Sequence, residues 1–138
     1  PPEIGILDVK LTEVARTDAL FGSLPINQKC LQWHSVEVAQ PPDGATILAS
    51  SKDCRVQAMR IGDFAWSAQY HVELEPDTIS NWGEVPAYAS ALAASLGQGA
   101  LDRMRQDAAL HMESFADVSR ALYDNFMTVA RATAKTTC

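Results

Sequence analysis

Short runs of apolar and β-branched residues, separated by turn-forming residues, mark the first half of the chain as strand-rich. These runs cover residues 4–11, 30–38, 46–50, 56–61 and 64–70. Gly62-Asp63 separates the last two runs and predicts a tight hairpin, because glycine and aspartate suit turn positions. The first half of the chain is therefore predicted to form a sheet of short strands.

The second half has the spacing of α-helices. Pro76 predicts the first turn of a short helix that ends at Trp82. Residues 87–96 are alanine-rich, and a Gly-Gln-Gly break separates them from two helical stretches between residues 100 and 134. In the last stretch, apolar residues recur at steps of three and four and predict one stripe that faces the core. The stripe consists of Phe115, Val118, Leu122, Phe126 and Val129.

Strands followed by helices are compatible with two architectures. One is an α+β domain, and the other is the back half of an α/β domain whose first units lie upstream. The opening strand at residues 4–11 needs neighbouring strands, which favours the second interpretation. We find no repeat or linker that divides the chain, so residues 1–138 are predicted to belong to a single domain.

Composition narrows the classes of function. The chain is 47% hydrophobic and carries 11 basic against 17 acidic residues, a net charge of −6. This balance disfavours a nucleic-acid partner, and no apolar run approaches the roughly 20 residues that a membrane span needs. We expect a soluble, cytoplasmic protein. The cysteines and histidines are too scattered to predict a metal site, and nothing in the sequence calls for a cofactor.

The segment Gln69-Tyr70-His71-Val72-Glu73 carries the strongest chemical signal. Side chains at positions i and i+2 of a strand share a face, so Glu73 is placed to orient the imidazole of His71. A base held by a carboxylate is two-thirds of a nucleophilic triad. His71 and Glu73 are therefore the candidate catalytic residues.

This segment resembles the strand-end motif Gln-Phe-His-Pro-Glu of class I glutamine amidotransferases, with tyrosine and valine as the two substitutions. Further segments resemble the GMP-synthase-like members of that family in order and spacing. They are Gly5-Ile6 with Val9, Leu11 and Thr12; Leu20-Phe21 with Leu24-Pro25; Gln32-Trp33-His34; Pro42 with Gly44-Ala45 and Leu48-Ala49-Ser50-Ser51; and Cys54 with Gln57-Ala58, Arg60 and Gly62. The region from Trp82 to Leu110 is much less diagnostic.

The resemblance implies an α/β fold of the flavodoxin-like, three-layer kind, of which this chain is the C-terminal part. It implies glutamine as substrate, hydrolysed to glutamate and ammonia by a Cys-His-Glu triad, and a synthetase partner that receives the ammonia. In the family, the backbone at the positions of Ser35 and Val36 holds the amino-acid end of glutamine. For His34, a structural role beside a packed Trp33 is the simpler interpretation.

The family's nucleophile lies on a Gly-x-Cys-x-Gly turn, and no cysteine here has that setting. Cys30, Cys54 and Cys138 are interpreted as structural or incidental thiols. The resemblance therefore places the nucleophile in an upstream half of the domain. Without that half the chain would expose a sheet edge and part of its core, and a homo-oligomer is one way to cover them.

Three functions stay open from the sequence. The chain is part of an active glutamine amidotransferase, or it is a non-catalytic binding or regulatory module of the same ancestry. The third alternative is a related cysteine hydrolase that acts on γ-glutamyl or peptide bonds.

Overall fold

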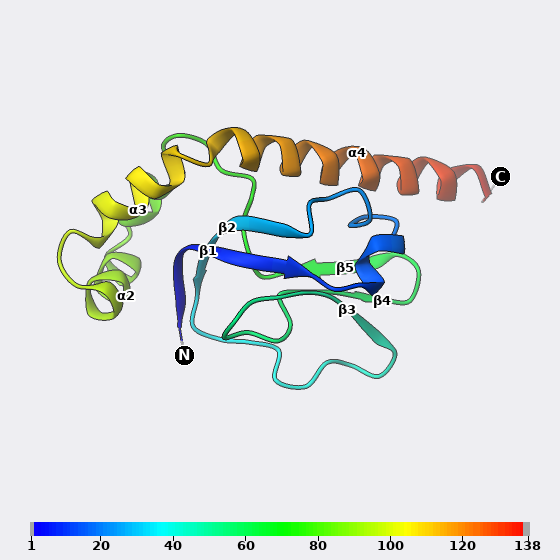
Figure 1. Ribbon diagram of the computed structural model, residues 1–138, viewed down its shortest axis with the longest axis horizontal. Helices are drawn as coiled ribbons and strands as arrows, with labels where there is room; N and C mark the ends of the chain where they lie inside the picture. The colour runs from blue at the N-terminus through cyan, green and yellow to red at the C-terminus, as the bar shows by residue number, and fades with distance from the viewer. Residues whose placement is uncertain (1, 137–138) are drawn as a thin grey trace.

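The computed structural model describes residues 2–136, which form an antiparallel sheet followed by a series of α-helices (Figure 1). The strands are β1 (Glu3–Leu11), β2 (Asn27–His34), β3 (Ala45–Ser50), β4 (Ala58–Ile61) and β5 (Ala65–Ala68), with a short 3-10 helix at Val14–Thr17. The helices are α1 (Thr78–Gly83), α2 (Pro86–Leu96), α3 (Ala100–Ala109) and α4 (Met112–Thr136). All five predicted strands and all four predicted helices are confirmed, with bounds that differ by a few residues.

The order of strands in the sheet is β2-β1-β3-β4-β5. β1 pairs with β2 along nearly its whole length, from Glu3 opposite His34 to Lys10 opposite Asn27. Its pairing with β3 is limited to Lys10 and Leu11. The edge of β1 that faces away from β2 is therefore unpaired with β3 over most of its length. An open strand edge of this kind can accept a further strand.

The predicted hairpin joins β4 to β5. Ile61 pairs with Ala65, and Gly62 in the connection has a φ of 60°. Glycine adopts this left-handed conformation without the steric cost that a side chain would add. The local turn signal in the sequence is therefore sufficient to place this element.

Two clusters of buried side chains hold the fold together. One lies between the sheet and the loop after β1, and includes Val9, Phe21 and Leu48. The other joins Ile4 and Leu31 of the sheet to the helices, which contribute Ile79, Leu92, Ala100, Met104, Ala108 and Phe115. Figure 1 shows α2 and α3 beside one end of β1, while α4 crosses the molecule. The second cluster therefore fixes the helical segment against the strands β1 and β2.

The apolar stripe of α4 is core over only part of its length. Phe115 and Val118 are buried, whereas Phe126 is 51% exposed and Val129 is half-buried. The prediction that the whole stripe faces the core is wrong for Phe126, because the buried part of the helix lies at its N-terminal end. Asn125 ties the middle of the helix to the loop after β1 by donating to Leu20 O and Ser23 Oγ, both at 2.8 Å.

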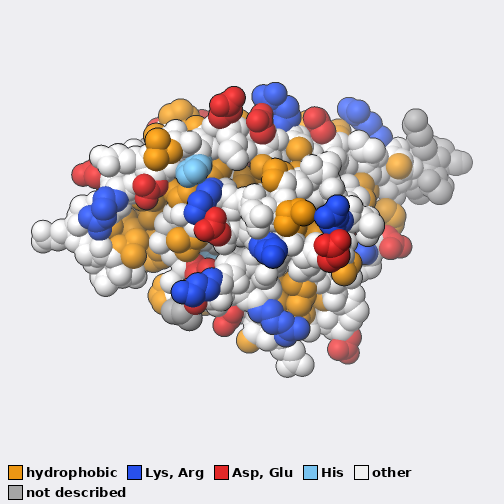
Figure 2. Space-filling view, in the orientation of Figure 1, with side chains coloured by type: hydrophobic (Ala, Val, Ile, Leu, Met, Phe, Trp, Pro, Cys, Tyr) orange, Lys and Arg blue, Asp and Glu red, His pale blue; other side chains and the backbone are white. Residues whose placement is uncertain are grey.

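The surface mixes charge and apolar groups. On the face that Figure 2 shows, Lys and Arg alternate with Asp and Glu, and hydrophobic side chains are visible between them. The exposed hydrophobic residues of α4 include Tyr123 as well as Phe126. No helix within residues 2–136 is both long enough and apolar enough to span a bilayer.

Candidate active site

His71 and Glu73 lie in an extended segment that follows β5 and returns alongside β2. The backbone of His71 exchanges hydrogen bonds with Leu31 of β2, at 2.9 and 3.0 Å. The Nδ1 atom of His71 lies 2.6 Å from Glu73 Oε1, and the second carboxylate oxygen accepts from the Val72 N–H at 2.9 Å. The two side chains that the sequence paired by spacing therefore meet in the structure.

This hydrogen bond sets both the tautomer of the histidine and the charge of the glutamate. A carboxylate oxygen can only accept, so Nδ1 of His71 carries the proton. The hydrogen bond from His71 is the main reason that the pKa of Glu73 is lowered to about 2. No group within residues 2–136 bonds the Nε2 atom of His71, so this nitrogen is available to a further group.

The low pKa of Glu73 predicts a defined acid sensitivity. The folded-state pKa is about 2, below the ordinary 4.5, so the unfolded chain takes up this proton first as the pH falls. The stabilisation from this carboxylate is full above about pH 4.5 and is lost as the pH falls toward 2. We expect Glu73→Gln to remove this part of the acid dependence, measured as the free energy of unfolding between pH 2 and 6. The same pH dependence in variant and wild type would contradict the assignment.

Trp82 of α1 packs against the imidazole of His71. Their ring centroids are 5.0 Å apart with an interplanar angle of 81°, and Trp82 also contacts Trp33 of β2 edge-on at 5.7 Å. The ring of His71 is thus held by the hydrogen bond from Nδ1 to Glu73 and by packing against the indole ring of Trp82. The sequence did not predict this contact, because Trp82 begins the less diagnostic region and no local spacing links it to His71.

Ser35 and Val36 form the exposed loop that follows β2. The side chain of Val36 is 76% exposed, and the loop begins four residues beyond Leu31, the partner of His71. His34 immediately precedes the loop and its Nδ1–H donates to the carbonyl of Val36 at 2.9 Å. No described residue accepts a hydrogen bond from the N–H groups of Ser35 or Val36. These donors are therefore open to a ligand.

The cysteines within the described residues lie in the interior. Cys30 is fully buried, and burial, with a smaller contribution from the charge of Asp8, raises the pKa of its thiol to about 12. Burial is also the main cause that raises the pKa of Cys54. A nucleophilic cysteine needs the opposite shift, toward the thiolate. Cys138 lies outside the described residues.

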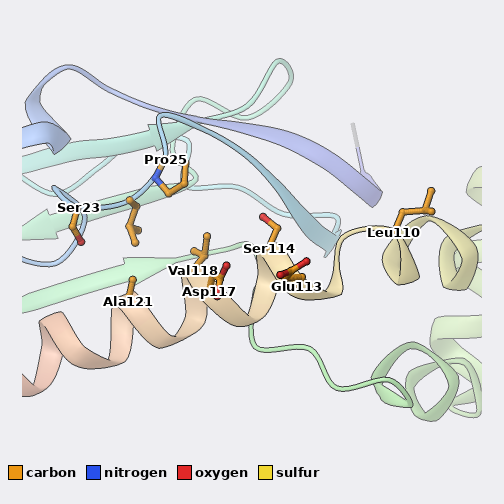
Figure 3. Close-up of a pocket in the computed structure, with 9 residues that line it drawn as sticks. Ser23, Pro25, Leu110, Glu113, Ser114, Asp117, Val118 and Ala121 are labelled. Atoms are coloured by element: carbon orange, nitrogen blue, oxygen red, sulfur yellow. The ribbon is translucent and has the colours of Figure 1, made fainter.

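Two grooves follow opposite faces of α4. The larger, of about 510 Å³, lies between α4 and the loop that contains Ser23 and Pro25, with Glu113 and Asp117 on its helical side (Figure 3). Neither His71 nor Glu73 lines it. The second groove, of about 450 Å³, is bordered by Val72, Glu73, Leu74 and Glu75 and by Ala116, Ser119, Arg120 and Tyr123 of α4. Of these two grooves, the second therefore adjoins the candidate site.

No group of three or more His, Cys, Asp or Glu side chains within residues 2–136 is arranged to hold a metal ion. The chemistry that the described residues offer is that of an oriented base. His71 can take a proton at Nε2 while Glu73 stabilises the resulting imidazolium.

Parts of the chain are similar to known proteins in sequence, and most of it is similar to solved structures in fold. No family model matches the chain. Over 75 residues it is 35% identical to a subunit of the glutamine-hydrolysing GMP synthase of Sulfolobus acidocaldarius, a stretch that covers 54% of this chain and 38% of that protein. The matched sequence therefore spans well under two-thirds of this relative.

Solved structures match nearly the whole chain. A glutamine amidotransferase from Thermotoga maritima superposes with a TM-score of 0.72 and 21% identity, over 91% of this chain and 50% of that one. A glutamine amidotransferase from Methylobacillus flagellatus gives 0.70 and 18%, over 93% of this chain and 53% of that one. The chain thus has the fold of about half of such a domain.

Proposed function

We propose that this chain, which is a class I glutamine amidotransferase-like domain over the part that it spans, supplies the histidine and the glutamate of a Cys-His-Glu triad. The triad hydrolyses the side-chain amide of glutamine to glutamate and ammonia. The observation that carries the proposal is the 2.6 Å contact between His71 Nδ1 and Glu73 Oε1, with Nε2 left open. Ammonia release from glutamine by the protein that contains both halves of the domain tests it.

The mechanism follows from the orientation of His71. A cysteine of the other half approaches Nε2, gives up its proton and attacks the amide carbon. The imidazolium then donates that proton to the departing ammonia, and water hydrolyses the γ-glutamyl thioester with His71 again as base. Glu73 holds the ring in the productive tautomer throughout and stabilises its positive charge.

Ser35 and Val36 are proposed to bind the amino-acid end of glutamine. The open N–H groups of this loop suit an α-carboxylate, because backbone donors are fixed in direction and carry no charge to be screened. The loop follows β2, the strand that also holds the backbone of His71. Substrate binding and the catalytic base therefore share one supporting strand.

The nucleophile-bearing half is proposed to cover the edges that this chain leaves open. The solved relatives are about twice as long as the part that this chain matches. The second edge of β1, the groove beside Glu73 and the exposed side chains of Tyr123 and Phe126 offer it strand pairing and apolar contact. The Sulfolobus relative is itself part of a glutamine-hydrolysing synthase, which supports a synthetase partner that receives the ammonia.

Removing the other half is expected to change the solution behaviour of this chain. Expressed alone, residues 1–138 should be marginally stable as a monomer or should self-associate through the uncovered surface. Light scattering coupled to size exclusion, together with thermal unfolding, measures both properties. The domain with both halves, measured under the same conditions, is the control. A monodisperse and thermally stable monomer of the short chain would contradict this prediction.

A further inference from the structure

A buried polar network lies between the N-terminus of β1 and the end of β2. Its centre is Glu3, which is 4% exposed and faces His34 across the β1–β2 ladder. Glu3 Oε1 accepts from Ser51 Oγ at 2.6 Å, and Oε2 accepts from Gln57 Nε2 at 2.7 Å. Both oxygens of this enclosed side chain therefore have a hydrogen-bond donor, as a buried polar group requires.

His34 connects this network to the loop. Its Nε2 atom lies 3.6 Å from Glu3 Oε2 and 2.9 Å from Gln32 Oε1, and its Nδ1–H donates to the Val36 carbonyl at 2.9 Å. The ring thus has buried polar groups beside Nε2 and the exposed loop beside Nδ1. The side chain of His34 is only 15% exposed although Val36 is largely in solvent.

We propose that Glu3 is a positioning residue that fixes the Ser35–Val36 backbone through His34. The inference rests on the proposed function, since it takes this loop to hold the α-carboxylate of glutamine. The bond from His34 to the Val36 carbonyl holds the Val36–Glu37 peptide plane in one orientation. Because His34 and Val36 are only two residues apart, this closes a tight turn and so limits the rotation of the Ser35 and Val36 N–H groups inside it. Burying an ionisable side chain such as Glu3 contributes little net stability to a fold. A role in orienting His34 is consistent with its burial.

The test uses the protein that contains both halves of the domain. Glu3→Gln keeps the size of the side chain and removes the charge that faces His34. We expect the KM for glutamine to rise about tenfold, equivalent to about 1.4 kcal/mol of binding, with kcat within about twofold of wild type. Ser51→Ala removes one donor to Glu3 and should give a smaller rise in KM in the same direction. If Glu3→Gln does not fold, the KM of the Ser51→Ala variant tests the proposal in its place.

Asp18→Asn is the matched control. Asp18 is also a buried carboxylate, bound by Arg60 and Trp66 at a place remote from His34. Its substitution should lower stability without changing the KM. If Glu3→Gln and Asp18→Asn destabilise the protein alike and both leave the KM unchanged, the positioning role is overturned.

A second readout is independent of turnover. The ring nitrogens of His34 and the amides of Ser35 and Val36 are followed by ¹H–¹⁵N NMR in the same variants. Glu3→Gln should shift these signals and Asp18→Asn should not, whereas unchanged signals in Glu3→Gln would overturn the proposal. If the wild type releases no ammonia from glutamine, the proposed function fails, while the NMR comparison still decides whether Glu3 fixes the loop.

Discussion

Replacing His71 with asparagine is expected to lower kcat for glutamine hydrolysis by about 10³-fold or more in the protein that carries both halves of the domain. Asparagine preserves a donor near the position of Nδ1 but has no group that can take the proton of a nucleophilic thiol. The thiol would then attack mainly in its protonated, weakly nucleophilic form. Steady-state ammonia release measures kcat and KM separately.

Two variants make this result specific. Glu73→Gln should lower kcat less, by about 10- to 100-fold, because the base is still present but loses the carboxylate that orients and stabilises it. His111→Asn is the control, since the ring of His111 lies beside Phe115, whereas that of His71 lies beside Glu73 and Trp82. A His71→Asn variant that retains wild-type kcat would exclude the triad and would favour a non-catalytic binding module. Activity on γ-glutamyl peptides but not on glutamine would favour the hydrolase alternative.

Phe115→Ala is expected to have the largest effect on stability. The side chain is 1% exposed and joins α4 to Leu31 and Met104 in the second core cluster. Truncating a buried phenylalanine costs about 3–5 kcal/mol, a large share of the roughly 5–15 kcal/mol that stabilises a domain. Urea unfolding of the chain, followed by circular dichroism, measures the loss, and we expect the variant to be partly unfolded without denaturant.

Phe126→Ala is the matched control for Phe115→Ala. It removes the same side chain from the same helix at a position that is 51% exposed, so the cost in the short chain should be below about 1 kcal/mol. Equal losses for the two variants would show that the distal half of α4 is buried after all. In the protein with both halves, a larger cost at Phe126 would support contact with the other half.

The sequence determined the elements and the contact between His71 and Glu73. The strands and helices follow from hydrophobic spacing within each segment, and the hairpin at Gly62 follows from the turn residues themselves. His71 and Glu73 meet because they are two positions apart in an extended segment, so no distant contact is needed to bring them together. Local geometry fixes these features, and for that reason they can be predicted from one sequence.

The tertiary structure decided which surfaces are covered and which distant groups meet. Gln57 reaches Glu3 across 54 residues of sequence, and Trp82 reaches His71 only because α1 packs against the end of β2. The same holds for Phe126, whose place in a regular apolar stripe did not make it core. Periodicity specifies a face of a helix, but burial of that face depends on whether another element lies against it, and this is a property of the packed chain.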